Sequence, residues 1–200
     1  MPSPFSIVID NDALVNLTRV DKDHRIFNSL SLVFSKIHVP TEIFKEYEIG
    51  ENHYPERNWL IRTLGYSTHP LWQKCTEYDS LVLDLYRTTP GIDKGEAAAL
   101  AQFRKIGARF IVSDDRTFAR SILELDKTIK VISSLHVLCW LDLLNYLSSW
   151  DGCLKSYHSQ AKINSKRLRE CYELAASSFG IPVDKKRLSQ KTSLKGLGIT

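Results

Sequence analysis

The chain has 200 residues, of which 43% are hydrophobic and 25% charged, and these values suit one globular domain with a short appendage. No apolar run is long enough to span a membrane, and the four widely spaced cysteines form no Cys-x-x-Cys pair or Cys/His cluster of zinc spacing, so we expect a cytoplasmic protein with reduced thiols. The net charge of +4 is uneven, because residues 155–200 carry +7 and residues 1–154 carry −3.

In chain order, the sequence alternates between short apolar strands and helices. Strands are predicted over residues 5–9, 37–39, 110–113 and 129–132, where β-branched residues gather. Helices are predicted over residues 12–17, 23–34, 41–49, 58–64, 76–86, 93–107, 116–125, 135–147 and 160–178. The alternation predicts an α/β fold with three α/β/α layers, in which helices cover both faces of a central parallel sheet.

The C-terminal part of the chain differs from the rest in charge. We predict a main domain over residues 1–149 and a C-terminal helix with a basic tail over residues 150–200. From Ile181 onward the residues are basic and poor in aromatics, which favours a flexible arm, with a docked tail as the alternative. Lys185, Lys186 and Arg187 could follow the phosphate backbone of RNA, or they could simply be solvated.

Acidic side chains stand where predicted strands end. Asp10 follows the strand over 5–9, and Asp114 and Asp115 follow the strand over 110–113. Glu46 lies on the helix over 41–49, and Glu96 lies in the first turn of the helix over 93–107. Ligands of open parallel sheets bind beyond the carboxyl ends of the strands, and several carboxylates at one place need cations to neutralise them. This pattern favours Mg²⁺ or Mn²⁺, which can activate water against a phosphodiester.

Each acid also has a structural interpretation. Asp10 or Asp12 could cap the following helix, and Asp114 could do the same for its own helix. Asp93-x-x-Glu96 has the spacing of a capping box, and Glu46 could be a solvated helix residue.

Four segments together resemble the PIN-domain family of metal-dependent ribonucleases, in particular the branch whose third motif is D-x-G-E. The segments are IVIDNDALVNL, VPTEIFKEYE, IDKGEAAALA and FIVSDDRTFAR. The resemblance covers roughly residues 5–140 and fades after Val131, where the family often has a glycine that this chain lacks.

This resemblance implies a PIN-like fold and an enzyme. It implies that Asp10, Glu46, Glu96 and Asp114 are catalytic and that they hold Mg²⁺ or Mn²⁺ together with Asp115. The implied reaction is hydrolysis of RNA. Many members are toxins that an antitoxin protein blocks, and homodimers are common, so both partners are expectations for this chain.

Five further residues are expected to support the site. Asn11 could donate a hydrogen bond to a carboxylate or water, or it could cap a helix. Ser113 could hold Asp114, bind phosphate or act as a cap, and Asp93 could cap the helix that carries Glu96. Arg116 and Arg120 lie one turn apart and could balance the acids or contact RNA phosphates; for Arg120, an ion pair with Asp115 is the alternative.

Two other functions are compatible with parts of the pattern. Asp10-x-Asp12 after an apolar strand is similar to the motif of aspartyl-phosphate phosphohydrolases, although Ala13 departs from it and the reading leaves Glu46 and Glu96 unused. A non-catalytic scaffold with a PIN-like fold is the second alternative, because a fold alone does not establish activity.

Overall fold

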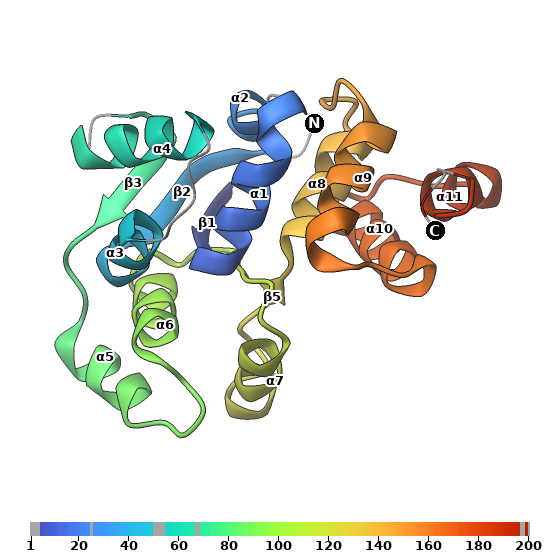
Figure 1. The fold of residues 1–200 in the computed structure, drawn as a ribbon. Helices are drawn as coiled ribbons and strands as arrows, with labels where there is room; N and C mark the ends of the chain where they lie inside the picture. The colour runs from blue at the N-terminus through green and yellow to red at the C-terminus, as the bar shows by residue number, and fades with distance from the viewer. Residues whose placement is uncertain (1–4, 25, 50–54, 67–68, 197–198, 200) are drawn as a thin grey trace.

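The central sheet has five parallel strands in the order β3-β2-β1-β4-β5 (Figure 1). The computed structural model describes residues 5–24, 26–49, 55–66, 69–196 and 199. Its strands are β1 (Phe5–Ile9), β2 (Phe34–Pro40), β3 (Trp72–Cys75), β4 (Phe110–Val112) and β5 (Val131–Ile132). The direction in which strands are added to the sheet reverses between β1 and β4. Strands β2 and β3 are added on one side of β1, and β4 and β5 are then added on its other side.

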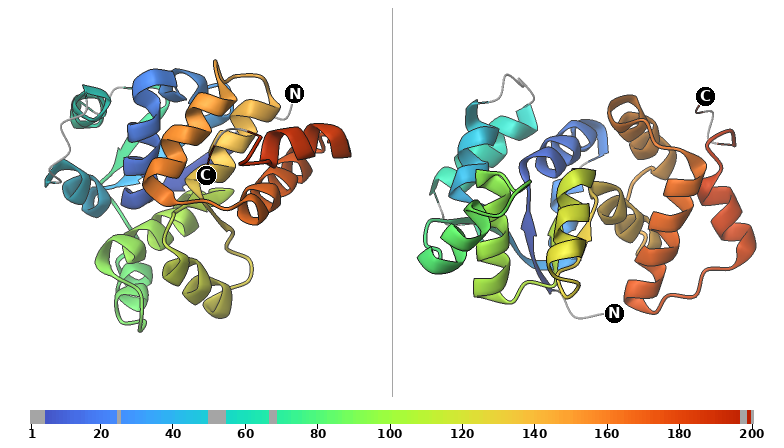
Figure 2. Two further views of the ribbon diagram at one scale, coloured as in Figure 1. Left: turned by 45° about the vertical axis from the view of Figure 1, so that its right-hand side comes forward. Right: turned by 90° about the horizontal axis from the view of Figure 1, so that it is seen from below.

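Helices cover both faces of this sheet, which confirms the predicted α/β/α architecture (Figures 1 and 2). One face carries α1 (Asn11–His24), α2 (Ile26–Leu30) and α4 (Pro55–Tyr66). The other face carries α6 (Lys94–Ile106) and α7 (Arg116–Leu125), with α5 (Ser80–Arg87) packed on α6. Helix α3 (Thr41–Ile49) starts at the end of β2 and contacts both α1 and α6.

Strand β1 lies at the centre of the sheet, so both of its faces are buried. Ile7, Val8 and Ile9 are at most 1% exposed. In β1 they pair with Phe110, Ile111 and Val112 of β4. A strand buried on both faces has a continuous apolar run, which is why FSIVI could be recognised from the sequence. The small buried residues Ala97, Ala98, Ala99 and Ala101 allow α6 to pack closely against β1, β2 and β4.

Residues after 149 pack into the same apolar core. Helix α8 (Ser134–Leu143) contacts α10 (Ser165–Phe179), and α9 (Trp150–Ala161) contacts α1. Trp140 of α8 lies against four phenylalanine rings with centroids 5.4 to 6.0 Å away, namely Phe5, Phe34, Phe110 and Phe179. These rings join the C-terminal helices to the amino ends of the central strands. No helix among the described residues is long and apolar enough to cross a membrane.

The expectation of a flexible basic arm is wrong, because the tail forms helix α11 (Lys185–Thr192) packed on α10. Leu188 of α11 is buried, and the Trp150 indole donates to the Lys191 carbonyl at 2.9 Å. The Lys191 ammonium donates to the Asp142 carboxylate at 2.7 Å, and that carboxylate also accepts from the Tyr172 hydroxyl. The buried Leu188 side chain, the hydrogen bond from Trp150 and the ion pair between Lys191 and Asp142 therefore hold the tail.

Several element boundaries differ from the sequence prediction. Strand β3 and helix α9 were not expected, and the helix predicted over 76–86 begins only at Ser80, where Asp79 caps it. The helix predicted over 23–34 ends at Leu30, and β2 begins at Phe34. Strand β3 has only four residues, and its position is set by pairing with β2 from Ile37↔Trp72 to Pro40↔Cys75 rather than by its own pattern.

Candidate functional site

The carboxyl ends of β1 and β4 meet at the point where the strand order reverses, and acidic residues gather there. Asp10 follows β1, and its amide donates to the carbonyl of Val112 at the end of β4 at 2.9 Å. Helices α1, α6 and α7 all begin at this edge, so their amino ends face the acids and partly offset the negative charge. The acidic cluster discussed below consists of Asp10, Asp12, Glu46, Asp93, Glu96, Asp114 and Asp115.

Asp10 is, together with Glu96, the most buried acid of the cluster, and each has 8% of its surface exposed. Its Oδ1 accepts from the Asn11 amide at 2.8 Å, and its Oδ2 accepts from the Ser113 hydroxyl at 2.9 Å. Burial, followed by the charges of Asp12 and Glu96, raises the pKa of Asp10 to about 8 despite these two bonds. A carboxyl group with this pKa is costly to ionise until a cation arrives.

Ser113 and Asn11, both near Asp10, were expected to support the site through their side chains, and in the described part of the chain only the Ser113 side chain bonds to an acid of the cluster. Ser113 holds Asp10 rather than Asp114, and its hydroxyl also accepts from the Asp115 amide at 3.1 Å. Asn11 contributes its backbone amide, while its side-chain Oδ1 is buried with no hydrogen-bond partner in the described part of the chain.

Asp12 is closer to the centre of the cluster than the sequence suggested. Its Oδ1 accepts from the amides of Ala13 at 2.6 Å and Asp114 at 3.1 Å, which ties the start of α1 to the end of β4. Burial and then the charges of Asp114 and Asp115 raise the pKa of Asp12. The Asp-x-Asp spacing was the only signal in the sequence, and it fits a helix cap equally well.

Glu96 and Asp93 form the predicted capping box at the start of α6. The Asp93 carboxylate accepts from the Glu96 amide at 2.8 Å, and the Glu96 carboxylate accepts from the Asp93 amide at 2.9 Å. Burial, followed by the charges of Asp93, Asp115 and Asp12, raises the pKa of Glu96 to about 7. Capping therefore does not exclude a site role, because the Glu96 carboxylate also senses Asp115 and Asp12 from two other segments.

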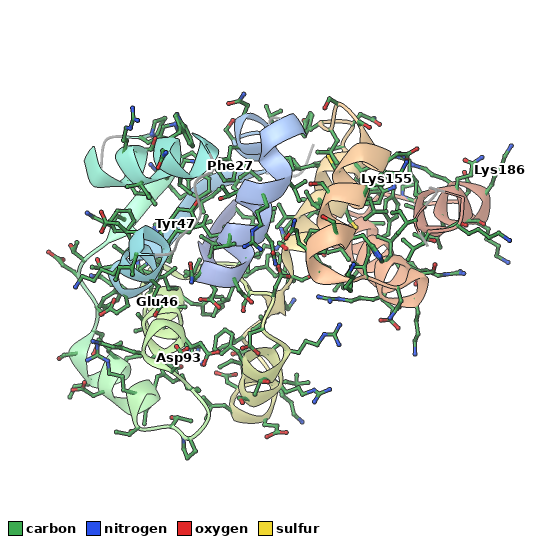
Figure 3. All side chains as sticks on the ribbon, in the orientation of Figure 1. Phe27, Glu46, Tyr47, Asp93, Lys155 and Lys186 are labelled. Carbon is green, nitrogen blue, oxygen red and sulfur yellow. The ribbon has the colours of Figure 1, made fainter. Side chains whose placement is uncertain are left out.

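Glu46 reaches the cluster because residue 95 has no side chain. A Cβ atom at Gly95 would lie 3.0 Å from Glu46 Oε1 and 3.5 Å from Oε2. Figure 3 shows Glu46 on α3 and Asp93 at the start of α6 on the same side of the molecule. Burial and then the charge of Asp93 raise the pKa of Glu46. The glycine of D-x-G-E thus lets α3 and α6 approach until their carboxylates interact.

Asp114 differs from the other acids because hydrogen-bond donors occupy its carboxylate. Oδ1 accepts from the Ser134 amide at 3.0 Å and the Tyr157 hydroxyl at 3.2 Å. Oδ2 accepts from the Asn16 side-chain amide at 2.7 Å and from the Ser134 hydroxyl. Four donors match the four lone pairs of a carboxylate, so a metal bond to Asp114 would require the loss of one of them. In this arrangement Asp114 joins β4 to α1, α8 and α9.

Asp115 and the two arginines lie at the outer side of the cluster. Asp115 is exposed and caps α7, its Oδ1 accepting from the amides of Thr117 at 2.5 Å and Phe118 at 3.1 Å. Arg116 lines a hollow with Asp114 and Asp115, whereas Arg120 lines a neighbouring one without acids. Among the residues described, no ion pair joins Arg120 to Asp115.

The residues predicted to bind RNA at the C-terminus are far from these acids. Lys185 and Lys186 are exposed at the start of α11. Figure 3 shows Lys186 at the opposite end of the molecule from Glu46 and Asp93. A strand of RNA held on α11 would therefore have to extend across the molecule to reach the acidic cluster.

The acidic cluster has the chemistry of a divalent-cation site. All its candidate ligands are carboxylate oxygens, which Mg²⁺ and Mn²⁺ prefer. Among the described residues, no Lys or Arg forms an ion pair with Asp10, Asp12, Glu46 or Glu96. In the same part of the chain, no three His, Cys, Asp or Glu side chains are already placed to hold one ion together. Binding therefore requires rotation of side chains that already lie near one another.

Comparison with known proteins identifies one matching family. A family model described as a PIN domain matches residues 6–175. The matched segment runs from β1 into α10 and includes every residue of the acidic cluster. Searches among curated proteins and among solved structures found no match.

Proposed function

Since the chain belongs to the PIN-domain family, whose members are generally nucleases, we propose that it is a metal-dependent endoribonuclease that hydrolyses RNA phosphodiester bonds. The observation that carries the proposal is the uncompensated charge at the edge of β1 and β4. Burial and mutual repulsion raise the pKa values of Asp10, Asp12, Glu46 and Glu96, and none of the four has a basic partner among the described residues. A bound cation would remove this repulsion.

We assign the cation ligands to the acids that have oxygens available. Three of these ligands, Asp10, Glu46 and Glu96, come from three different segments. Two more are Asp12 and Asp115, whose Oδ1 atoms accept from backbone amides and whose Oδ2 atoms are left for an ion. Bound Mg²⁺ or Mn²⁺ would supply an activated water and stabilise the leaving oxygen. Asp114, whose four acceptor positions are occupied, is then a positioning residue that fixes the loop between β4 and α7.

The remaining side chains orient these ligands. The Ser113 hydroxyl donates to Asp10 Oδ2 and the Asn11 amide donates to Oδ1, so each oxygen of Asp10 retains a lone pair for an ion. The capping box fixes the Glu96 carboxylate at the amino end of α6, where the partial positive charge of the helix favours its ionised form. Gly95 keeps the space that Glu46 needs.

The test compares isosteric variants of two cluster acids with a surface control. Asp10→Asn and Glu96→Gln keep the shape of each side chain, and Gln at position 96 can still complete the capping box. Glu124→Gln removes an exposed acid of α7 outside the cluster. We expect the two cluster variants to lower Mn²⁺-dependent cleavage of an end-labelled single-stranded RNA by at least about 100-fold, with Glu124→Gln unchanged, because ligand loss removes the ion that activates water.

Other outcomes would support the alternatives. If the native protein binds RNA and Mn²⁺ produces no cleavage, the scaffold interpretation replaces this one. If it hydrolyses small phosphate esters through an acyl phosphate trapped on Asp10, it is a phosphohydrolase. Melting temperatures of all variants, measured with a chelator present, separate loss of ligands from loss of folding.

We extend the proposal to a toxin whose action an antitoxin protein blocks, because the resemblance includes many such pairs. Induced expression in a bacterial host should then arrest growth for the native chain and leave growth unchanged for Asp10→Asn. A homodimer in the cytoplasm is the accompanying expectation, and light scattering of the purified chain measures its mass directly.

A further inference from the structure

A second hollow of about 730 Å³ lies along the outer edge of β5, between α7 and α10, and takes no part in the acidic cluster. Figures 1 and 2 show β5 between these two helices, with α7 well separated from α10. We call it the β5 groove. Its lining residues lie within 109–110, 119–132 and 174–178, and they include no acid.

The floor of the β5 groove is an unpaired strand edge. Strand β5 is the last strand of the described sheet, and it pairs only with β4 there. The carbonyl of Lys130 accepts from the Ile111 amide of β4 at 3.0 Å, and the carbonyl of Ile132 accepts from the amide of Ser113, just after β4, at 2.9 Å. Because the backbone groups of alternate residues point to opposite sides of a strand, the amide and carbonyl of Val131 point away from β4 into the groove. An extended segment of another chain could bond to them.

The two walls of the groove present large apolar side chains to solvent. Leu123 of α7 is 60% exposed and Leu174 of α10 is 51% exposed. A strand added beside β5 would direct alternate side chains toward opposite walls, so one apolar residue would meet Leu123 and the next would meet Leu174. Both leucines would then be removed from water, which stabilises binding by roughly 25 cal/mol for each Å² buried.

The charge of the groove selects the flanking residues of such a segment. Arg120, Lys127 and Lys130 are exposed, and no ion pair holds any of them within the described chain. Arg109 is fixed differently, since its guanidinium lies over the Phe5 ring at 4.8 Å and donates to the Ser178 carbonyl. Four cations and no acids favour a partner that carries Asp or Glu.

We propose that the β5 groove binds an extended, acidic segment of a protein partner by strand addition, with apolar residues against Leu123 and Leu174 and carboxylates against Lys127 and Lys130. A peptide fits better than RNA because the one aromatic ring in the groove, Phe110, is only 5% exposed and offers no face for a base. The neighbouring hollow shares Ala119, Val131, Ile132 and Leu174 and is also lined by Asp115, so the bound segment would end beside the acidic cluster.

The test uses the full chain, labelled with ¹⁵N, and a short synthetic peptide in which two adjacent valines are flanked by glutamates, so that the two valines point to opposite walls of the groove. We expect saturable shifts of backbone amide resonances in residues 116–132 and 170–178. Lys127→Glu with Lys130→Glu should raise the dissociation constant about tenfold or more, because like charges then face the peptide. Leu174→Glu should have a similar effect. Matched controls are Lys166→Glu and Leu81→Glu, both exposed and outside the groove, and these should bind like the native chain.

Several results would overturn the proposal. One is the lack of saturable shifts at about 1 mM peptide, a concentration at which even a weak specific site is half filled. Others are shifts confined to residues outside the groove, or equal affinity in the charge-reversed variant. Equal binding of a peptide with lysine in place of glutamate would remove the charge argument. Tighter binding of a uridine oligonucleotide at the same residues would make the groove a nucleic-acid site.

Discussion

Replacement of Asp10 by Asn should stabilise the metal-free protein in alkaline solution. The ordinary pKa of an Asp is 3.8, and in the folded chain that of Asp10 is about 8. Between these two values the unfolded chain has lost the proton and the folded chain still holds it. Stability therefore falls as the pH rises through this window, and Asn, which does not ionise, removes the fall.

The magnitude follows from the size of the pKa shift. One pKa unit corresponds to about 1.4 kcal/mol, so a rise from 3.8 to about 8 corresponds to roughly 6 kcal/mol above pH 8. Asp12 and Glu96 share this repulsion and keep part of it in the variant. We therefore expect the difference in unfolding free energy between Asp10→Asn and the native chain to grow by about 2–4 kcal/mol from pH 5 to pH 8.5.

Urea denaturation in the presence of a chelator, followed by circular dichroism at both pH values, measures this difference. Added Mn²⁺ should then stabilise the native chain at pH 8.5, by about 2.7 kcal/mol at 100 times its dissociation constant, and leave Asp10→Asn nearly unaffected. A difference that is the same at pH 5 and pH 8.5 would refute the reasoning, since it would mean that Asp10 ionises normally in the folded chain.

Three further perturbations test the supporting geometry. Gly95→Ala should move Glu46 by a few tenths of an ångström and lower Mn²⁺ affinity in a calorimetric titration, while the gain in helix propensity keeps urea stability unchanged or higher by up to about 1 kcal/mol. Ser134→Ala removes the hydroxyl that donates to the Asp114 carboxylate. It should lower the free energy of unfolding in urea by about 1–3 kcal/mol. Lys191→Met leaves the buried Asp142 with Tyr172 alone, so α11 should detach and limited proteolysis should cut the tail several times faster.

Local chemistry in the sequence was sufficient for the elements that the acidic cluster depends on. Helix α6 begins at the Asp93 cap and ends at Gly107, whose φ of 60° is left-handed, and both signals lie within one turn of the helix ends. Helix α7 also begins after an acidic cap, although the cap is Asp115 and not Asp114 as predicted. The buried run of β1 needed no long-range information because a central parallel strand is apolar on both faces.

Other features were decided by contacts between distant segments. The four-residue strand β3 exists through its pairing with β2, and α11 is held by Trp150 and Asp142, which lie about 40 to 50 residues earlier. Asp114 has a clear motif position, yet Ser134 and Tyr157 occupy its oxygens. Residue types and spacing determined which acids could meet at one edge of the sheet. Only the packed structure determined how many lone pairs each acid retains. The hydrogen-bond donors lie on distant helices, and the local sequence does not specify that these helices pack beside the acid.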